Sequence, residues 1–161
     1  KSQRTLSLKF SNLGLSSELS RAVADLGYEA PTPIQEKSIP VVLMGRDILG
    51  SAQTGTGKTA AFLTSIIADL VNHSIDEERF IGEARSLILA PTRELAMQIS
   101  SDARDLAKYT DLAVHTLVGG IDYSKQLRLL EKKHCDILVG TPGRLLDFAN
   151  NKDIFDRGYF F

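Results

Sequence analysis

A glycine-rich stretch at residues 52–59 (AQTGTGKT) constrains the fold of this 161-residue chain more than any other feature. It follows a short apolar run at Asp47–Ala52 and opens a helical pattern that continues to Asn72. Between a strand and a helix, such a turn lets backbone N–H groups cradle phosphates. The stretch departs from the common G-x-x-x-x-G-K-[ST] pattern only at its first position, Ala52. We therefore expect a nucleotide site, the alternative being a glycine-rich turn that only caps a helix.

Several residues of this stretch have distinct expected roles. Gly55 and Gly57 let the backbone wrap around phosphate oxygens. The Lys58 ammonium is expected to bind the terminal phosphates, and the Thr59 hydroxyl to ligate Mg²⁺, so both residues are our catalytic candidates. The expected cradle comprises Ala52, Gln53, Thr54, Gly55, Thr56, Gly57, Lys58 and Thr59.

Strand and helix patterns alternate along the rest of the chain. Apolar runs predict strands at Asp47–Ala52, Ser86–Ala90, Val114–Val118 and Asp136–Val139. Amphipathic patterns predict helices at Lys58–Asn72, Arg93–Tyr109, Asp122–Lys133 and Pro142–Asn150, after a helical prelude at Ser17–Leu26 and Thr32–Val42. This order predicts an α/β fold, a parallel sheet flanked by helices, with ligands at the carboxyl ends of the strands. The fully apolar run Ser86–Ala90 predicts a strand covered on both faces.

The helix expected from Thr32 has two interpretations at Gln35. Thr32, Pro33 and Gln35 fit a capping box, with threonine as the N-cap, proline at N1 and glutamine at N3. Alternatively, the Gln35 amide pairs with adenine, whose edge offers one acceptor and one donor and so differs from guanine. The spacing favours neither interpretation, and both hold if the cap fixes the loop while the amide faces a base.

Composition limits how the chain can bind a partner. Its net charge is −1 and its pI is about 6.3, whereas bulk electrostatic binding of nucleic acid usually needs a pI above about 9. The single cysteine, Cys135, excludes an internal disulfide. His73, His115 and His134 lack metal-ligand spacing. No apolar run approaches the ~20 residues of a membrane span, so we expect a cytoplasmic protein with no membrane partner.

Five segments, in order, resemble the motifs of DEAD-box RNA helicases. The first resembles the Q motif with its upstream aromatic residue, the second the family's phosphate loop, which commonly begins with alanine, and the last three its RNA-contacting motifs. These segments are Phe10 with Gly27–Gln35, residues 52–59, Pro91–Leu95, Gly119-Gly120 and Thr141–Arg144. The resemblance runs from Phe10 to about Ala149. Residues 62–65 and 119–127 are most similar to the bacterial RhlB-like subgroup.

This resemblance implies the RecA-like, ATP-binding lobe of an RNA helicase, with residues 1–45 as a Q-motif prelude and 46–161 as an incomplete parallel core. It implies that Gln35 recognises adenine, that Phe10 or Tyr28 stacks on the base, and that the cofactors are ATP and Mg²⁺. It also implies backbone contacts to RNA from Pro91, Thr92, Arg93, Glu94, Gly119, Gly120, Thr141, Pro142, Gly143 and Arg144. We expect a monomer, with the RNA-degradation machinery of RhlB-like proteins docking on a second lobe.

The chemistry of the three RNA-contacting motifs agrees with this implication. Thr92 and Thr141 each precede an expected helix, whose first N–H groups offer partial positive charge to a phosphate. The glycine pair permits close backbone approach, and Arg93 and Arg144 add forked cationic donors. Phosphate contacts carry little sequence information and need no strongly basic surface. For any one of these loops, an ordinary capped helix start is the alternative.

An acid that would position Mg²⁺ for hydrolysis is missing from the expected ligand edge. The strand at Ser86–Ala90 runs into Pro-Thr-Arg, and Asp136 precedes its own apolar run. In the resembled family an Asp-Glu-Ala-Asp motif follows the last motif seen here, so we expect a C-terminally truncated chain that is inactive alone. Rival interpretations are another P-loop NTPase and a non-catalytic nucleotide- or RNA-binding module.

Overall fold

The computed structural model describes residues 9–75, 79, 81 and 83–151. These fall into two compact units. The helical unit is drawn from Lys1–Asn72 and Asp105–Thr110, and the sheet unit from His73–Arg104 and Asp111–Phe161. Helix α4 (Arg93–Ala107) contributes residues to both.

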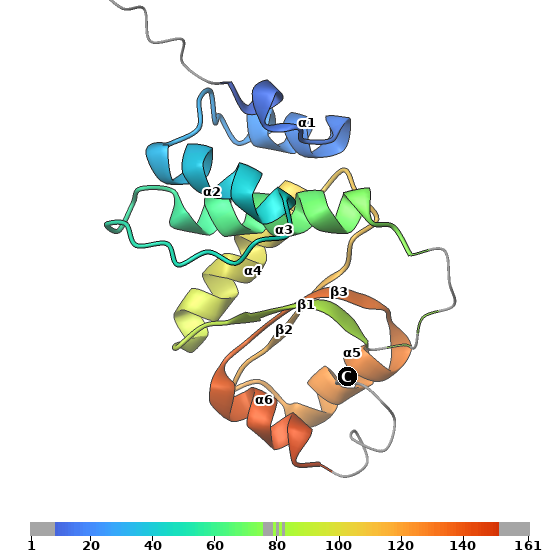
Figure 1. The fold of residues 1–161 in the computed structure, drawn as a ribbon. Helices are drawn as coiled ribbons and strands as arrows, with labels where there is room; N and C mark the ends of the chain where they lie inside the picture. The colour runs from blue at the N-terminus through green and yellow to red at the C-terminus, as the bar shows by residue number, and fades with distance from the viewer. Residues whose placement is uncertain (1–8, 76–78, 80, 82, 152–161) are drawn as a thin grey trace, which may run out of the picture. The chain divides into compact units, whose positions relative to one another are not determined.

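The helical unit consists of η1 (Phe10–Leu13), α1 (Ser17–Asp25), α2 (Pro33–Leu43) and α3 (Lys58–Asn72), together with the end of α4 (Figure 1). The Ser16 hydroxyl accepts from the Leu19 N–H at 3.3 Å and so caps α1. Gly27, at φ 76°, follows the end of that helix in the left-handed conformation that often ends helices. Each of α1, α2 and α3 has apolar side chains that are fully or almost fully buried, among them Leu19, Val23, Ile39, Leu63 and Ile67.

The predicted strand at Asp47–Ala52 is wrong, because this segment forms no strand ladder. Leu49 is fully exposed. A strand needs a hydrogen-bonded neighbour, and in the part of the chain that the structure describes, all strand pairing occurs within the sheet unit. The glycine-rich stretch therefore follows an irregular segment.

The sheet unit contains three parallel strands in the order β1-β3-β2. They are β1 (Ala84–Leu89), β2 (Val114–Leu117) and β3 (Cys135–Gly140), each within two residues of a predicted strand. Central β3 is buried throughout. On β1, however, Leu87 and Leu89 are 54% and 60% exposed, so the expected covering on both faces is wrong. An apolar run predicts a strand but not whether that strand lies at an edge.

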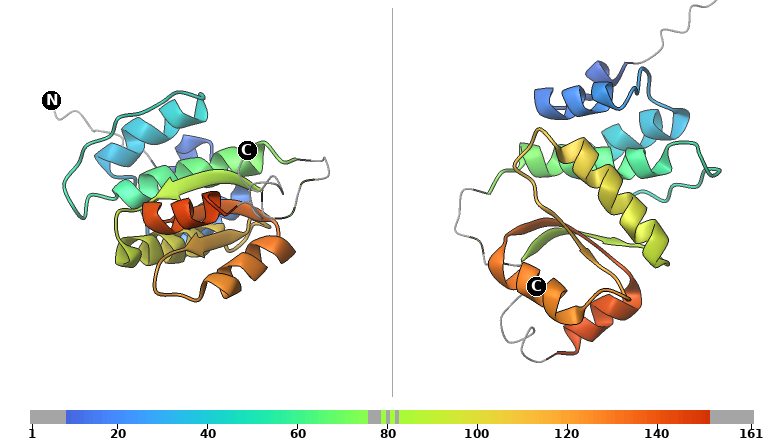
Figure 2. Two further views of the ribbon diagram at one scale, coloured as in Figure 1. Left: turned by 90° about the horizontal axis from the view of Figure 1, so that it is seen from below. Right: turned by 180° about the vertical axis from the view of Figure 1, so that it is seen from behind.

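Helices lie on both faces of this sheet (Figure 2), where they contact β2 and β3. Helices α5 (Tyr123–Lys132) and α6 (Pro142–Ala149) share one core cluster with β2 and β3, in which Leu130, Leu145 and Phe148 pack against Leu117 and Leu138. On the other face, α4 contacts β2 through a hydrogen bond of 2.7 Å between the Thr116 and Ser100 hydroxyls. The parallel α/β fold predicted from the sequence is confirmed.

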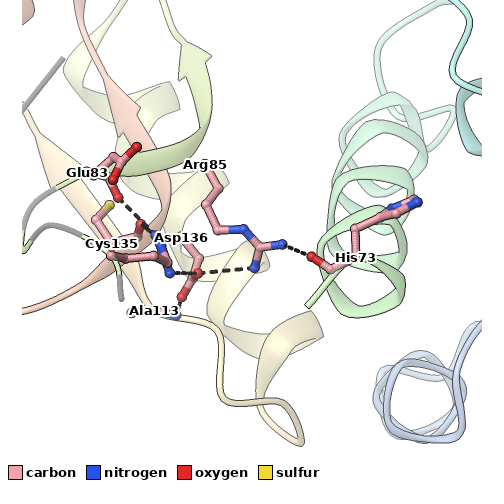
Figure 3. Close-up of polar contacts among 7 residues, drawn as sticks. His73, Glu83, Arg85, Ala113, Cys135 and Asp136 are labelled. Atoms are coloured by element: carbon pink, nitrogen blue, oxygen red, sulfur yellow. Dashed lines mark hydrogen bonds and ion pairs between the residues drawn. The ribbon is translucent and has the colours of Figure 1, made fainter. Parts of the chain in front are cut away.

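Asp136 joins several segments at the amino end of β3 (Figure 3). Its Oδ1 accepts from Arg79 Nη1 at 2.8 Å and from Arg85 Nη1 at 3.4 Å, while its Oδ2 accepts from the Ala113 N–H at 2.8 Å. Arg85 also donates to the His73 carbonyl. This carboxylate, with its side chain 8% exposed, links β1, β3 and the segment that precedes β2, at the edge away from the expected ligands.

Candidate functional site

The glycine-rich stretch forms an exposed turn at the start of α3. Gly55 and Gly57 have φ of 81° and 83°, a region that L side chains rarely adopt. The Lys58 ammonium donates to the Ala52 carbonyl, which closes the turn from its last residues back to its first. Thr56 Oγ1 donates to the Gln53 carbonyl at 2.6 Å. The first N–H groups of any helix have no acceptor within that helix, so the start of α3 is a place where a phosphate could bind.

Gln35 connects the start of α2 to this turn. Its Oε1 accepts from the Thr32 N–H at 2.9 Å, which is the glutamine half of the predicted capping box. Its Nε2 donates to the Gly57 carbonyl at 3.2 Å. Thr32 Oγ1 is buried without a hydrogen bond. A Cβ on Gly57 would lie 2.4 Å from Gln35 Nε2, so the turn and the glutamine fit only because residue 57 is glycine.

The two aromatic candidates, Phe10 and Tyr28, lie together. Their ring centroids are 6.3 Å apart and the ring planes differ by 25°. Phe10 is 6% exposed and Tyr28 is 41% exposed. Only Tyr28 therefore presents a substantial ring surface to a base.

The sheet unit brings its three candidate loops to one edge. Gly140 is paired with Leu89 on one side and with Leu117 on the other, so the carboxyl ends of all three strands are level. Two further bonds continue this alignment past the strands: the Ala90 N–H donates to the Gly140 carbonyl at 3.0 Å, and the Thr141 N–H donates to the Leu117 carbonyl at 3.1 Å. The loops that lead into α4, α5 and α6 consequently start side by side.

The first of these loops, Pro91–Glu94, is exposed and opens α4. Thr92 Oγ1 accepts from the Leu95 N–H at 3.2 Å, as an N-cap threonine does. The Arg93 guanidinium lies against Gly120, where an added Cβ would be 2.3 Å from Nη1. Gly120 has φ 75°. The structure thus brings together Arg93 and the glycine pair, which the sequence separates.

The third loop, Thr141–Arg144, opens α6 with Pro142 at its start. Thr141 makes no side-chain cap, and Pro142 has no N–H, so the first N–H groups of this helix are those of Gly143 and Arg144, without a cap from Thr141. Arg144 is turned inward, with its side chain 13% exposed. Its Nη1 donates to the Ile121 carbonyl at 3.0 Å, and its Nε makes no hydrogen bond and lies 3.8 Å from Asp147 Oδ2. Most of its fork is therefore not presented to solvent.

One residue near this edge was not predicted from the sequence. Gln126 lies on the buried face of α5 and donates to the Val118 carbonyl at 2.9 Å. The signal that would have found it is a polar residue at an inward helical position, between Tyr123 and Leu130.

Cys135 lies at the amino end of β3, at the opposite end of the strand from the three loops. Burial raises the pKa of the Cys135 thiol to about 12, so this fully buried cysteine is no nucleophile. The described residues contain no group of three or more histidine, cysteine or acidic side chains that could hold a metal. Among the helices of these residues, none has the length and apolar character of a membrane span.

A glycine-rich turn at a helix start and three helix-start loops at the carboxyl edge of a parallel sheet are features typical of phosphate-binding α/β proteins. The chain matches the DEAD/DEAH box helicase family over residues 32–160 and belongs to that family.

Three curated relatives of this chain are named ATP-dependent RNA helicase RhlB. The chain is 55% identical to ATP-dependent RNA helicase RhlB of Pseudomonas syringae over 146 residues, which is 91% of this chain and 37% of that protein. It is 53% identical to RhlB of Pseudomonas aeruginosa over the same shares of both. RhlB of Salmonella newport is 47% identical, with 34% of its length covered. The chain thus spans little more than a third of the length of these curated relatives.

Solved structures agree on the fold. Mss116p bound to single-stranded RNA and AMP-PNP matches with a TM-score of 0.82 and 30% identity, covering 95% of this chain and 32% of that one. Dbp5 of S. cerevisiae bound to RNA and ADP with beryllium fluoride matches with a TM-score of 0.73 and 30% identity, covering 89% and 34%. The expected RecA-like helicase fold is therefore confirmed.

Proposed function

We propose that this chain is the ATP- and RNA-binding lobe of an RNA helicase, in which the whole protein couples ATP binding and hydrolysis to local opening of RNA duplexes. The observation that carries the proposal is the register at Gly140, because it gathers three helix-start loops at one edge. Membership of the DEAD/DEAH box family supports it. Further support comes from relatives named ATP-dependent RNA helicases and from similar folds solved with RNA.

ATP is the proposed nucleotide, with its phosphates on residues 52–59. Lys58 would exchange its bond to the Ala52 carbonyl for the terminal phosphates. The Thr59 hydroxyl would supply one ligand to Mg²⁺, with phosphate oxygens among the others, and the ion would neutralise phosphate charge.

The adenine base is proposed to meet Gln35 and an aromatic ring. Each end of a carboxamide can make two hydrogen bonds, and each end of Gln35 makes one within the described residues. One acceptor and one donor position thus remain, and because Gln35 is 4% exposed, its amide would have to be uncovered for a base to reach them. The exposed Tyr28, stacked with the buried Phe10, is the better ring for stacking on it.

RNA is proposed to bind the loop edge through its phosphates and sugars. The helix starts at Thr92 and Thr141 offer backbone N–H groups, and the exposed Arg93 offers a cation beside Gly120. Arg144 stays in the proposed site with one N–H already bonded to the Ile121 carbonyl. Such contacts are local, which is compatible with a net charge of −1.

We propose that these 161 residues bind nucleotide without turning it over. They contain no Asp-Glu-Ala-Asp sequence. Asp136, the one acidic residue in the described strands, is held by two arginines at the amino end of β3. Lys58 and Thr59 would act in hydrolysis only with groups from outside these residues. Docking to RNA-degradation machinery, proposed by similarity to RhlB-like proteins, would likewise belong to the whole protein.

Titration calorimetry tests the nucleotide half of this proposal. ATP should bind at least about tenfold more tightly than GTP, since a matched bidentate pair selects its base by roughly that factor. Lys58→Ala should weaken the binding of ATP by more than the wild-type difference between ATP and GTP, because it removes the phosphate-binding cation. Equal affinities for ATP and GTP would contradict the proposal that Gln35 recognises adenine.

Fluorescence anisotropy with a single-stranded oligouridylate tests the RNA half. Binding should weaken as salt rises, because phosphate contacts release counterions. Arg93→Ala should lower RNA affinity by about tenfold and leave ATP affinity unchanged. Lys132→Ala is the matched control, since it removes the same charge from the exposed far end of α5. Salt-independent binding, or equal losses in both variants, would contradict an RNA site at this edge.

A further inference from the structure

Gln126 carries a polar group where α5 otherwise buries apolar side chains. It is 4% exposed, and Leu130, one turn along the helix, belongs to the core cluster of the sheet unit. Its Nε2 donates to two backbone carbonyls, those of Val118 at 2.9 Å and Ile121 at 3.5 Å. Its Oε1 is buried and makes no hydrogen bond.

The two carbonyls fix the orientation of this amide. A reversed amide would turn Oε1 towards two carbonyl oxygens and lose both bonds. In the observed orientation Oε1 is an unsatisfied buried acceptor, which is costly, whereas methionine or leucine would fill a similar volume without that cost. The two hydrogen bonds that its N–H groups donate to backbone carbonyls therefore explain why this position holds glutamine.

Those N–H groups hold the Gly119-Gly120 turn from both sides. Val118 is the last residue before the glycine pair, and Ile121 is the first after it. The Ile121 carbonyl also accepts from Arg144 Nη1 at 3.0 Å, so side chains from α5 and α6 meet at one backbone oxygen. The two glycines between these anchors remain exposed.

We propose that Gln126 is a positioning residue that, with Arg144, keeps the Gly119-Gly120 turn in the shape in which its backbone receives RNA. This inference rests on the RNA site proposed above. Gln126 itself does not touch the RNA, because its side chain is buried behind the turn. A turn that is already ordered binds more tightly, since ordering it takes nothing from the binding free energy.

The first test examines the turn without RNA. Gln126→Met removes both donors at similar volume, and Leu130→Met is the matched control because it changes packing on the same face of α5. We expect amide hydrogen exchange at residues 119–121, followed by NMR, to become at least about tenfold faster in Gln126→Met alone. Gln126→Leu serves as a second variant with the same expectation if the methionine variant does not fold.

The second test compares ligands on the same proteins. Gln126→Met should weaken binding of a single-stranded oligouridylate by about tenfold and leave ATP affinity unchanged, while Leu130→Met changes neither. A general structural defect would instead lower both affinities in both variants.

The two tests distinguish a failure of the positioning role of Gln126 from a failure of the proposed RNA site. Unchanged exchange at residues 119–121 overturns the positioning role whatever the RNA result. Faster exchange with unaltered RNA affinity also overturns it. Faster exchange in a chain whose wild type does not bind oligouridylate overturns the proposed RNA site, while the hold of Gln126 on the turn stands.

Discussion

Adjacent glycines in the turn after β2 differ in what they tolerate. Gly120 has φ 75°, and an added Cβ would lie 2.3 Å from Arg93 Nη1, whereas nothing lies within 4 Å of a Cβ on Gly119. We expect Gly120→Ala to lower the free energy of unfolding by about 1–2 kcal/mol, and Gly119→Ala to change it by less than about 0.5 kcal/mol. Urea denaturation measures both. Equal losses would show that backbone conformation is not what requires glycine at residue 120.

The sequence indicated the types of the site residues better than the orientations of their side chains. Gln35, predicted either to cap α2 or to read a base, does form the cap and also bonds to the Gly57 carbonyl. Arg144, expected to supply a forked cationic donor to RNA, lies mostly buried. Gln126 was not singled out at all. The carbonyls that hold Gln126 and Arg144 belong to the β2–α5 connection, and no local pattern indicates where a side chain will find a distant acceptor.

At the scale of elements, β3 depends on the carboxylate at its amino end. Asp136 receives hydrogen bonds from Arg79, Arg85 and the Ala113 N–H. We expect Asp136→Asn to lower the free energy of unfolding by about 3 kcal/mol, because two largely buried guanidinium groups lose their anion. Asp147→Asn is the control: this carboxylate is 67% exposed, and its loss should cost less than about 1 kcal/mol. Similar effects of the two substitutions in urea denaturation would refute the anchoring role.

Element boundaries were predictable where a local signal sets them. Helices α3, α4 and α6 begin at Lys58, Arg93 and Pro142, as the sequence predicted, since capping residues and proline act within one turn. The strand predicted at Asp47–Ala52 failed for the opposite reason, because pairing requires a neighbour that the segment itself does not specify. The exposure of Leu87 and Leu89 on β1 was not predicted for the same reason, because an apolar run does not specify which neighbours its strand will have.

For the whole molecule, His115 makes stability depend on pH. Burial lowers the pKa of this imidazole below its usual value, Lys133 and Arg104 lower it further, and Asp136 opposes them. The unfolded chain therefore binds a proton more readily, and stability is lost as pH falls through about 6.5 towards the folded-state pKa. Urea denaturation between about pH 7.5 and 5.5 should show this loss, and His115→Gln should reduce it. The exposed His134→Gln should not, and an equally steep wild-type and His115→Gln profile would contradict the assignment.

The register at Gly140 also has a consequence for how such a domain tolerates change. Because β3 pairs with both of its neighbours, inserting one residue into it would shift its alignment with β1 and β2 together and invert its side chains. Lengthening any single loop would leave the other two where they are. The mutual spacing of all three loops is thus determined once, by the length of one strand, while each loop is free to vary in its own sequence.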